Sequence, residues 1–96
     1  MFILVSKYIK SVEEINKELE NHIKHLDKYY SLGKFVCSGR RNLRIGGVIL
    51  CKCENEEEVK EILKEDPFSS KGIAEYEIIE FSPTKYAEGF EKFINA

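Results

Sequence analysis

The sequence predicts a single α+β domain in which strands and helices follow the order β-α-β-β-α-β. Two observations support this order. Two segments repeat apolar residues at helical spacing, and four shorter segments are rich in β-branched and aromatic residues. The 96 residues, of which 43% are hydrophobic and 33% charged, suffice for one small core.

The first strand and the first helix are predicted from the opening third of the chain. Residues 2–9 are apolar with β-branched and aromatic members, which is typical of a strand. Ser11 then predicts a helix N-cap, because Glu14 three residues later completes a capping box, and Gly33 predicts the end of this helix. Six apolar side chains at helical spacing predict its buried stripe: Val12, Ile15, Leu19, Ile23, Leu26 and Tyr30.

The second and third strands are predicted at residues 35–38 and 45–53, on either side of a loop rich in Arg, Asn and Gly. The continuous apolar character of 45–53 indicates a strand with both faces covered. Three cysteines, an odd number, indicate a reduced compartment and not a disulfide framework. We expect all three to pack as small core residues: Cys37, Cys51 and Cys53.

Asn55 predicts the N-cap of the second helix, with Val59, Ile62 and Leu63 on its buried side. This helix must end near Glu65, because the residue before a proline avoids helical geometry. Residues 73–81 predict the fourth strand. Aromatic residues at helical spacing then predict a short helical tail at about 84–96, within one domain that spans 1–96: Tyr86, Phe90 and Phe93.

This order predicts a ferredoxin-like protomer, a four-stranded antiparallel sheet with two helices on one face. The third strand carries apolar residues on both alternating sets, Ile49 and Cys51 against Val48 and Leu50. The face without helices therefore needs a cover. In so short a chain a second copy is the expected cover, which predicts a homodimer with the sheets back to back.

Charge and hydropathy exclude several classes of partner. The net charge of −2 does not favour nucleic acid or a membrane surface. No apolar run approaches the ~20 residues of a membrane span, and the apolar start is too short for a signal peptide, so we expect a cytoplasmic protein. A ferredoxin-like RNA-binding domain would carry aromatic and basic residues on its central strands, where this chain has Gly, Ile, Cys and Val.

The strongest candidate for chemistry is the pair His22 and Asp66. His22 lies about 60° from the centre of the apolar stripe, at the boundary of burial, and Asp66 opens the turn Asp66-Pro67-Phe68. An imidazole held by a carboxylate makes a general base, and Phe68 would pack beside it and exclude water. The alternatives are a histidine packed at the helix edge and an aspartate that only makes a turn.

Other candidates are weaker. A metal held by His22 and His25 is disfavoured because no third ligand stands at suitable spacing, so we expect no metal site, and we expect His25 on the surface. Arginines in the hairpin loop are either solvated charges or a clamp for a carboxylate or phosphate: Arg40, Arg41 and Arg44. Arg40 is the preferred substrate-binding candidate, followed by Ser38 and Tyr8.

The chain resembles the YCII-related (YciI-like) family over nearly its whole length. The motifs that carry the resemblance are His22 followed by Gly33 and Ser38-Gly39, then Gly46-Gly47-Val48-Ile49, Asp66-Pro67-Phe68 and Tyr76-Glu77-Ile78-Ile79-Glu80-Phe81. Many members have a proline after Ser-Gly, where this chain has Arg40 and Arg41. This departure is expected either to reshape the mouth of the pocket or to give it a preference for an anion.

The resemblance implies a dimeric α+β barrel built from ferredoxin-like protomers, with His22 and Asp66 as the active-site pair. It also implies a lyase or isomerase that moves a proton on a small cyclic acid or a quinone, with no metal and no organic cofactor. The alternative is a non-enzymatic dimer that binds or senses a small molecule. A bound metabolite recovered unchanged would favour binding, whereas its conversion would favour catalysis.

Overall fold

A computed structural model of the protein describes residues 1–94, and its elements follow the predicted order. The main elements are β1 (Phe2–Tyr8), α1 (Val12–Ser31), β2 (Phe35–Arg40), β3 (Gly47–Cys51), α2 (Glu56–Lys64) and β4 (Ala74–Glu80). The chain also forms three short helices: η1 (Asn42–Arg44), α3 (Pro67–Ser70) and η2 (Phe90–Phe93).

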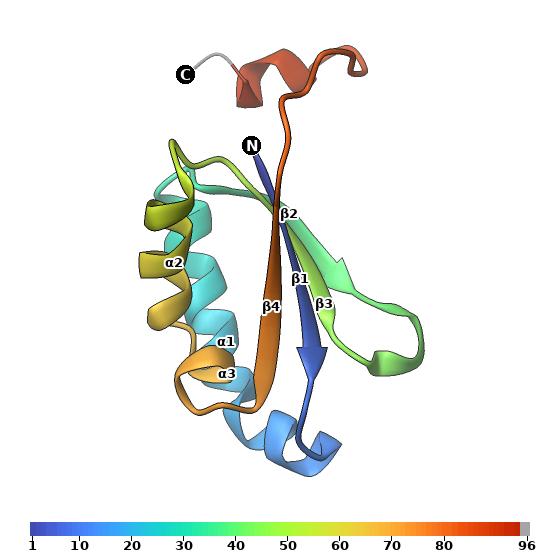
Figure 1. Cartoon of the computed structure of the whole chain (residues 1–96), viewed down its shortest axis with the longest axis vertical. Helices are drawn as coiled ribbons and strands as arrows, with labels where there is room; N and C mark the ends of the chain where they lie inside the picture. The colour runs from blue at the N-terminus through green and yellow to red at the C-terminus, as the bar shows by residue number, and fades with distance from the viewer. Residues whose placement is uncertain (95–96) are drawn as a thin grey trace.

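The strands form one antiparallel sheet in the order β2-β3-β1-β4. Helices α1, α2 and α3 all lie on one face of this sheet (Figure 1). This topology is the ferredoxin-like α+β fold. After β4 the chain runs past the end of the sheet, and η2 lies apart from the other helices (Figure 1).

The predicted caps begin both main helices. The Ser11 hydroxyl accepts a hydrogen bond from the Glu14 amide at 3.3 Å, and the Asn55 side-chain oxygen accepts one from the Glu58 amide at 2.9 Å. Helix α2 ends at Lys64, as expected from the proline that follows. The third strand is shorter than predicted and begins at Gly47, because the preceding residues form η1 and its exit.

The predicted stripe of α1 is largely wrong as a core surface. Only Ile15 of the stripe is buried, whereas Leu19 is 37% and Ile23 47% exposed. The residues that α1 does bury are Ile15, His25 and Tyr29. Helix α1 is rotated about its axis relative to the orientation that the stripe predicts. The C-terminal end of α2 supplies polar partners for one side of α1, while the other side borders an open cavity.

His25, which we expect on the surface from the sequence, is buried instead, with 6% of its area exposed. Its Nε2 lies 2.9 Å from the carbonyl oxygen of Ile62, so the ring donates a hydrogen bond to α2. The aromatic rings of Tyr29 and Phe35 pack around it. A polar ring can be buried here because α2 offers a backbone acceptor, which the sequence pattern does not reveal.

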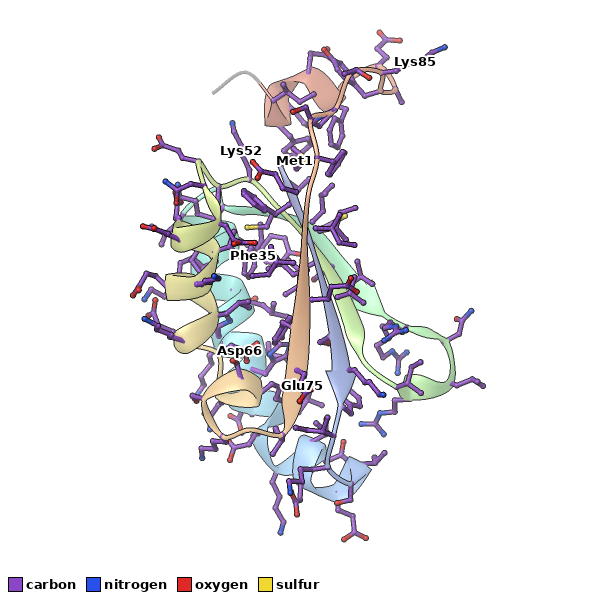
Figure 2. The ribbon with its side chains drawn as sticks, viewed as in Figure 1. Met1, Phe35, Lys52, Asp66, Glu75 and Lys85 are labelled. Atoms are coloured by element: carbon purple, nitrogen blue, oxygen red, sulfur yellow. The ribbon has the colours of Figure 1, made fainter. Side chains whose placement is uncertain are left out.

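The core lies between the sheet and the helices. Figure 2 shows Phe35 in this layer, between α2 and the strands. A second, smaller cluster packs around α3. The larger cluster contains Phe2, Leu4, Tyr29, Phe35, Ile49, Cys51, Val59, Ile62 and Leu63, and the smaller one contains Ile15, Phe68, Ile73 and Ala74. Together the two clusters fix α1, α2 and α3 relative to the sheet.

The opposite face of the sheet has no helix over it (Figure 1). It carries apolar residues beside the charged Lys7, Glu75 and Glu77, which the register places on the same face. Val48 is 37% and Ile79 41% exposed, and Cys37 lies on the same face, opposite Leu50. Cys37 is exposed, so its expected place in the core is wrong for the single chain. Cover by a second copy stays a prediction. The register places five apolar residues on this face: Ile3, Val5, Val48, Leu50 and Ile79.

None of the helices within residues 1–94 is long and apolar enough to cross a membrane.

Candidate active site

A cavity of about 310 Å³ lies between α1 and the sheet. Two exposed residues of the predicted stripe, Leu19 and Ile23, form one wall together with the half-buried Leu26 of α1. Strand β3 forms the opposite wall with Gly47 and Ile49. The apolar residues that α1 leaves out of the core therefore line a pocket.

His22 and Asp66 meet at the inner wall of this cavity. His22 Nδ1 lies 2.9 Å from Asp66 Oδ1, although 44 residues separate them in the chain. Asp66 is fully buried at the junction of α2 and α3, beside β4 (Figure 2). His22 borders the cavity and Asp66 lies behind it, so the carboxylate reaches a ligand only through the imidazole.

Two further donors hold the Asp66 carboxylate. The backbone N–H of Phe68 donates to Oδ1 at 3.0 Å, and the hydroxyl of Tyr76 donates to Oδ2 at 2.5 Å. Asp66 thus caps the short helix α3 in addition to binding His22. A buried carboxylate with three donors needs no water to remain charged.

Burial alone would raise the pKa of Asp66, but the hydrogen bond and charge of His22 and the bonds from Tyr76 and Phe68 hold it below its usual value. The carboxyl group is therefore ionised at neutral pH and can only accept. Burial, with the Asp66 charge, raises the pKa of Tyr76, which therefore stays a donor. It follows that His22 Nδ1 carries the proton and that Nε2 holds the free lone pair of the neutral ring.

The ring of Phe68 stacks on the imidazole of His22 at a centroid distance of 3.9 Å, with 5° between their planes. Tyr8 meets Phe68 edge-on at 6.0 Å. Both aromatic rings border the cavity, and only 13% of the His22 side chain is exposed. These contacts separate the dyad from bulk water and restrict rotation of the imidazole.

The other predicted site residues lie at the outer part of the cavity. Ser38 and Arg40 border it from β2, and the Ser38 hydroxyl is 2.7 Å from the hydroxyl of Tyr30 on α1. Arg44 also borders the cavity and donates to the side chain of Asn16. Arg41 does not border it, because its guanidinium donates to a backbone oxygen of β1 at 3.1 Å.

Tyr76 is the site residue that the sequence reasoning did not single out. Tyr76 lies in the cavity wall and donates a hydrogen bond to the carboxylate of Asp66. The alternation of side chains between the two faces of the strand along residues 73–81 is the sequence signal that could have found it. Ala74, Tyr76 and Ile78 alternate along β4 on its helix-facing side. Within residues 1–94 no group of three or more His, Cys, Asp and Glu side chains is arranged to hold a metal ion.

The family model for the YCII-related domain matches residues 1–82, which include the sheet, the dyad and the cavity. The chain belongs to the YCII-related family. No curated protein matches this YCII-related chain. Among solved structures, it is similar to the 5-chloro-2-hydroxyhydroquinone dehydrochlorinase of Burkholderia phenoliruptrix AC1100, in a complex with 2,5-dihydroxybenzoquinone. The TM-score is 0.70 at 15% identity, over 85% of this chain and 94% of the other, so the similarity shows a shared fold.

Proposed function

We propose that this YCII-related protein is a lyase or isomerase that removes a proton next to a carbonyl group of a small molecule. The observation that carries the proposal is the contact between His22 and a buried Asp66 at the wall of a cavity. His22 Nε2 is the base, and Asp66 fixes the Nδ1–H tautomer and stabilises the imidazolium that forms.

The reaction begins when His22 Nε2 takes a proton from the carbon next to a carbonyl, and the electron pair moves into that carbonyl as an enolate. In an isomerisation the imidazolium returns the proton to another carbon of the enolate. In an elimination the enolate carbonyl re-forms, a carbon–carbon double bond forms and the leaving group departs with its electron pair from the neighbouring carbon. The imidazolium then gives its proton to the leaving group or to water. Positioned acid–base groups contribute about 10²–10⁴-fold to such steps.

We propose that the substrate is a small cyclic acid or a quinone-like ring. Tyr8, Ile23 and Ile49 give the cavity that His22 borders apolar walls, which suit a ring-shaped substrate. Ser38 and Arg40 would bind polar substituents at the outer part of the cavity. The structural neighbour supports this choice, because it is a dehydrochlorinase whose structure contains a quinone.

The test is proton exchange in D₂O, followed by NMR on a set of cyclic keto acids and hydroxylated quinones. Deuterium incorporation or product formation should depend on the wild-type protein and fall about 10²–10⁴-fold in His22→Gln. Full activity of His22→Gln on a converted compound would refute the base role. Compounds that bind but are recovered unchanged would instead support a binding or regulatory protein.

We also propose that the protein is a homodimer that covers the face of the sheet opposite the helices. This face exposes Val48 and Ile79 in the single chain, and the helices leave it open (Figure 1). Sedimentation equilibrium should give twice the chain mass for the wild type and the monomer mass for Val48→Lys, with Lys24→Glu on α1 as a surface control. A monomeric wild type at micromolar concentration would overturn the dimer.

A further inference from the structure

We propose that the cavity selects an organic anion, with a carboxylate between Arg40 and Arg44 and an apolar body that reaches inward to His22. This inference rests on the proposed function and deepens it, because it names the class of substrate. Three features of the cavity carry it: the sign of its charges, the freedom of one guanidinium, and the separation between its two ends.

The ionisable groups that border the cavity are basic or neutral. Arg40 and Arg44 carry the fixed charges, and no Asp or Glu of the described part of the chain lies in the wall. The Asp66 carboxylate behind the wall is fully buried and occupied by three donors, so a ligand does not meet it directly. A half-enclosed apolar space with only cationic fixed charges favours an anion over a neutral molecule of the same shape.

The three arginines near β2 differ in their partners. Arg41 is bound to the backbone of Ser6, and Arg44 donates one nitrogen to Asn16. The Arg40 side chain has no hydrogen-bond acceptor or ion pair among residues 1–94, and its strand register directs it to the same side of the sheet as Ser38. Its guanidinium fork is therefore available to a carboxylate, which it can bind through two parallel N–H groups.

The backbone of η1 fixes the second arginine. Leu43 and Arg44 both have left-handed conformations, with φ of 67° and 53°, which residues other than glycine adopt at a cost. The hydrogen bond from Arg44 to Asn16 holds this conformation against α1. Arg44 is consequently held beside the cavity before any ligand arrives, so its charge is already in place.

The anionic and reactive ends of the ligand lie apart along α1. Asn16, which marks the position of the Arg44 guanidinium, precedes His22 by six residues, or about 9 Å along the helix axis. Between these ends Leu19 borders the cavity, with Ile49 of β3 in the opposite wall. The arrangement fits a ligand with its carboxylate at one end, an apolar middle, and the acidic carbon at the other end.

The experiment compares benzoate with benzamide, a neutral probe of nearly the same shape, by ¹H–¹⁵N chemical-shift titration. For the wild type, benzoate should bind at least about tenfold more tightly than benzamide, as expected for hydrogen bonds to a charged group. Its shifts should include the amides of β2 and the middle of α1. In Arg40→Gln the ratio should fall to near one, and in Arg40→Lys it should take an intermediate value.

Lys24→Gln is the matched control, because it removes one positive charge from α1 at an exposed position outside the cavity. The benzoate preference should survive in this variant. Equal affinities of the wild type for the two probes would overturn the inference, as would an unchanged preference in an Arg40→Gln variant that is folded by circular dichroism.

The binding assay does not depend on turnover, so the two proposals fail separately. Selective benzoate binding by a protein that converts no compound would retain the anion site and refute the proton-transfer function. Conversion of a neutral compound, combined with equal binding of benzoate and benzamide, would retain the proton-transfer function and refute the anion site.

Discussion

The imidazole of His22 lies flat on the phenyl ring of Phe68, with ring centres 3.9 Å apart. The backbone N–H of the same Phe68 donates to the carboxylate that binds His22. One three-residue turn therefore supplies both the aromatic face and the acceptor that orient the histidine. Removal of either contact should affect the other, because both depend on the geometry of the turn.

Phe68→Ala should lower the free energy of unfolding by about 3–5 kcal/mol, because it removes a buried ring that touches His22 and Tyr8. Chemical denaturation measures this loss. Tyr86→Ala is the control. Because Tyr86 is 45% exposed, this substitution should lower the free energy of unfolding far less. Similar losses in both variants would contradict the central packing role of Phe68.

The tautomer of His22 should be the Nδ1–H form in the neutral ring, because Asp66 is an ionised acceptor at 2.9 Å. Imidazole ¹⁵N shifts distinguish the two tautomers directly. In Asp66→Asn the proportion of the Nδ1–H form should fall. A predominant Nε2–H form in the wild type would show that Nε2 is not the base.

The acid stability of the fold should depend on Asp66. The hydrogen-bonded carboxylate has a pKa below its unfolded value, so it stabilises the fold at a pH above the ordinary aspartate value of about 3.9. This contribution is lost as the pH falls from that value through the lowered pKa of Asp66. Unfolding free energies between about pH 6 and pH 2 measure it, and Asp66→Asn should show a shallower decline in this window.

Tyr76→Phe should leave one buried oxygen of Asp66 without a donor. We expect a loss of about 1–3 kcal/mol in unfolding free energy, and a rise in the pKa of Asp66 because one stabilising bond is absent. The acid unfolding midpoint should move to higher pH. The control is Tyr30→Phe, which removes only an exposed hydroxyl contact with Ser38 and should leave the midpoint unchanged.

Gly46→Ala should disrupt the contact between the hairpin loop and β1. A Cβ at Gly46 would lie 1.8 Å from the backbone oxygen of Ser6, so the backbones must separate. We expect the free energy of unfolding to fall by about 3 kcal/mol or more, and the thermal midpoint to fall with it. Gly39→Ala is the matched control, since its Cβ would meet no atom within 4 Å. A thermal midpoint for Gly46→Ala equal to that of Gly39→Ala would refute the close approach.

Local signals predicted most of the fold. Caps at Ser11 and Asn55 and the break before Pro67 depend on neighbouring residues only, so the sequence contains them in full. The rotation of α1 could not be predicted in this way. It depends on where α2 places the carbonyl of Ile62, and an apolar stripe looks the same whether it faces a core or a ligand cavity.

The candidate site was only partly predictable for the same reason. The sequence indicated His22 and Asp66 separately, but their contact spans 44 residues and depends on the packing of α3 against α1. Tyr76 comes from β4, a strand whose alternation identifies a helix-facing side without identifying its partner. Phe68 was expected to pack near the dyad, and the parallel stacking of its ring depends on the α3 turn.

Helix α1 has two apolar sides with different roles. Ile15 and Tyr29 are buried against the rest of the protein, whereas Leu19 and Ile23 border the cavity and remain substantially exposed. Mutations at the second pair therefore escape much of the selection for folding that constrains the first. A lineage with this architecture can change which ligand it accepts through a few substitutions on one helix, while its scaffold and the histidine on that helix are inherited unchanged.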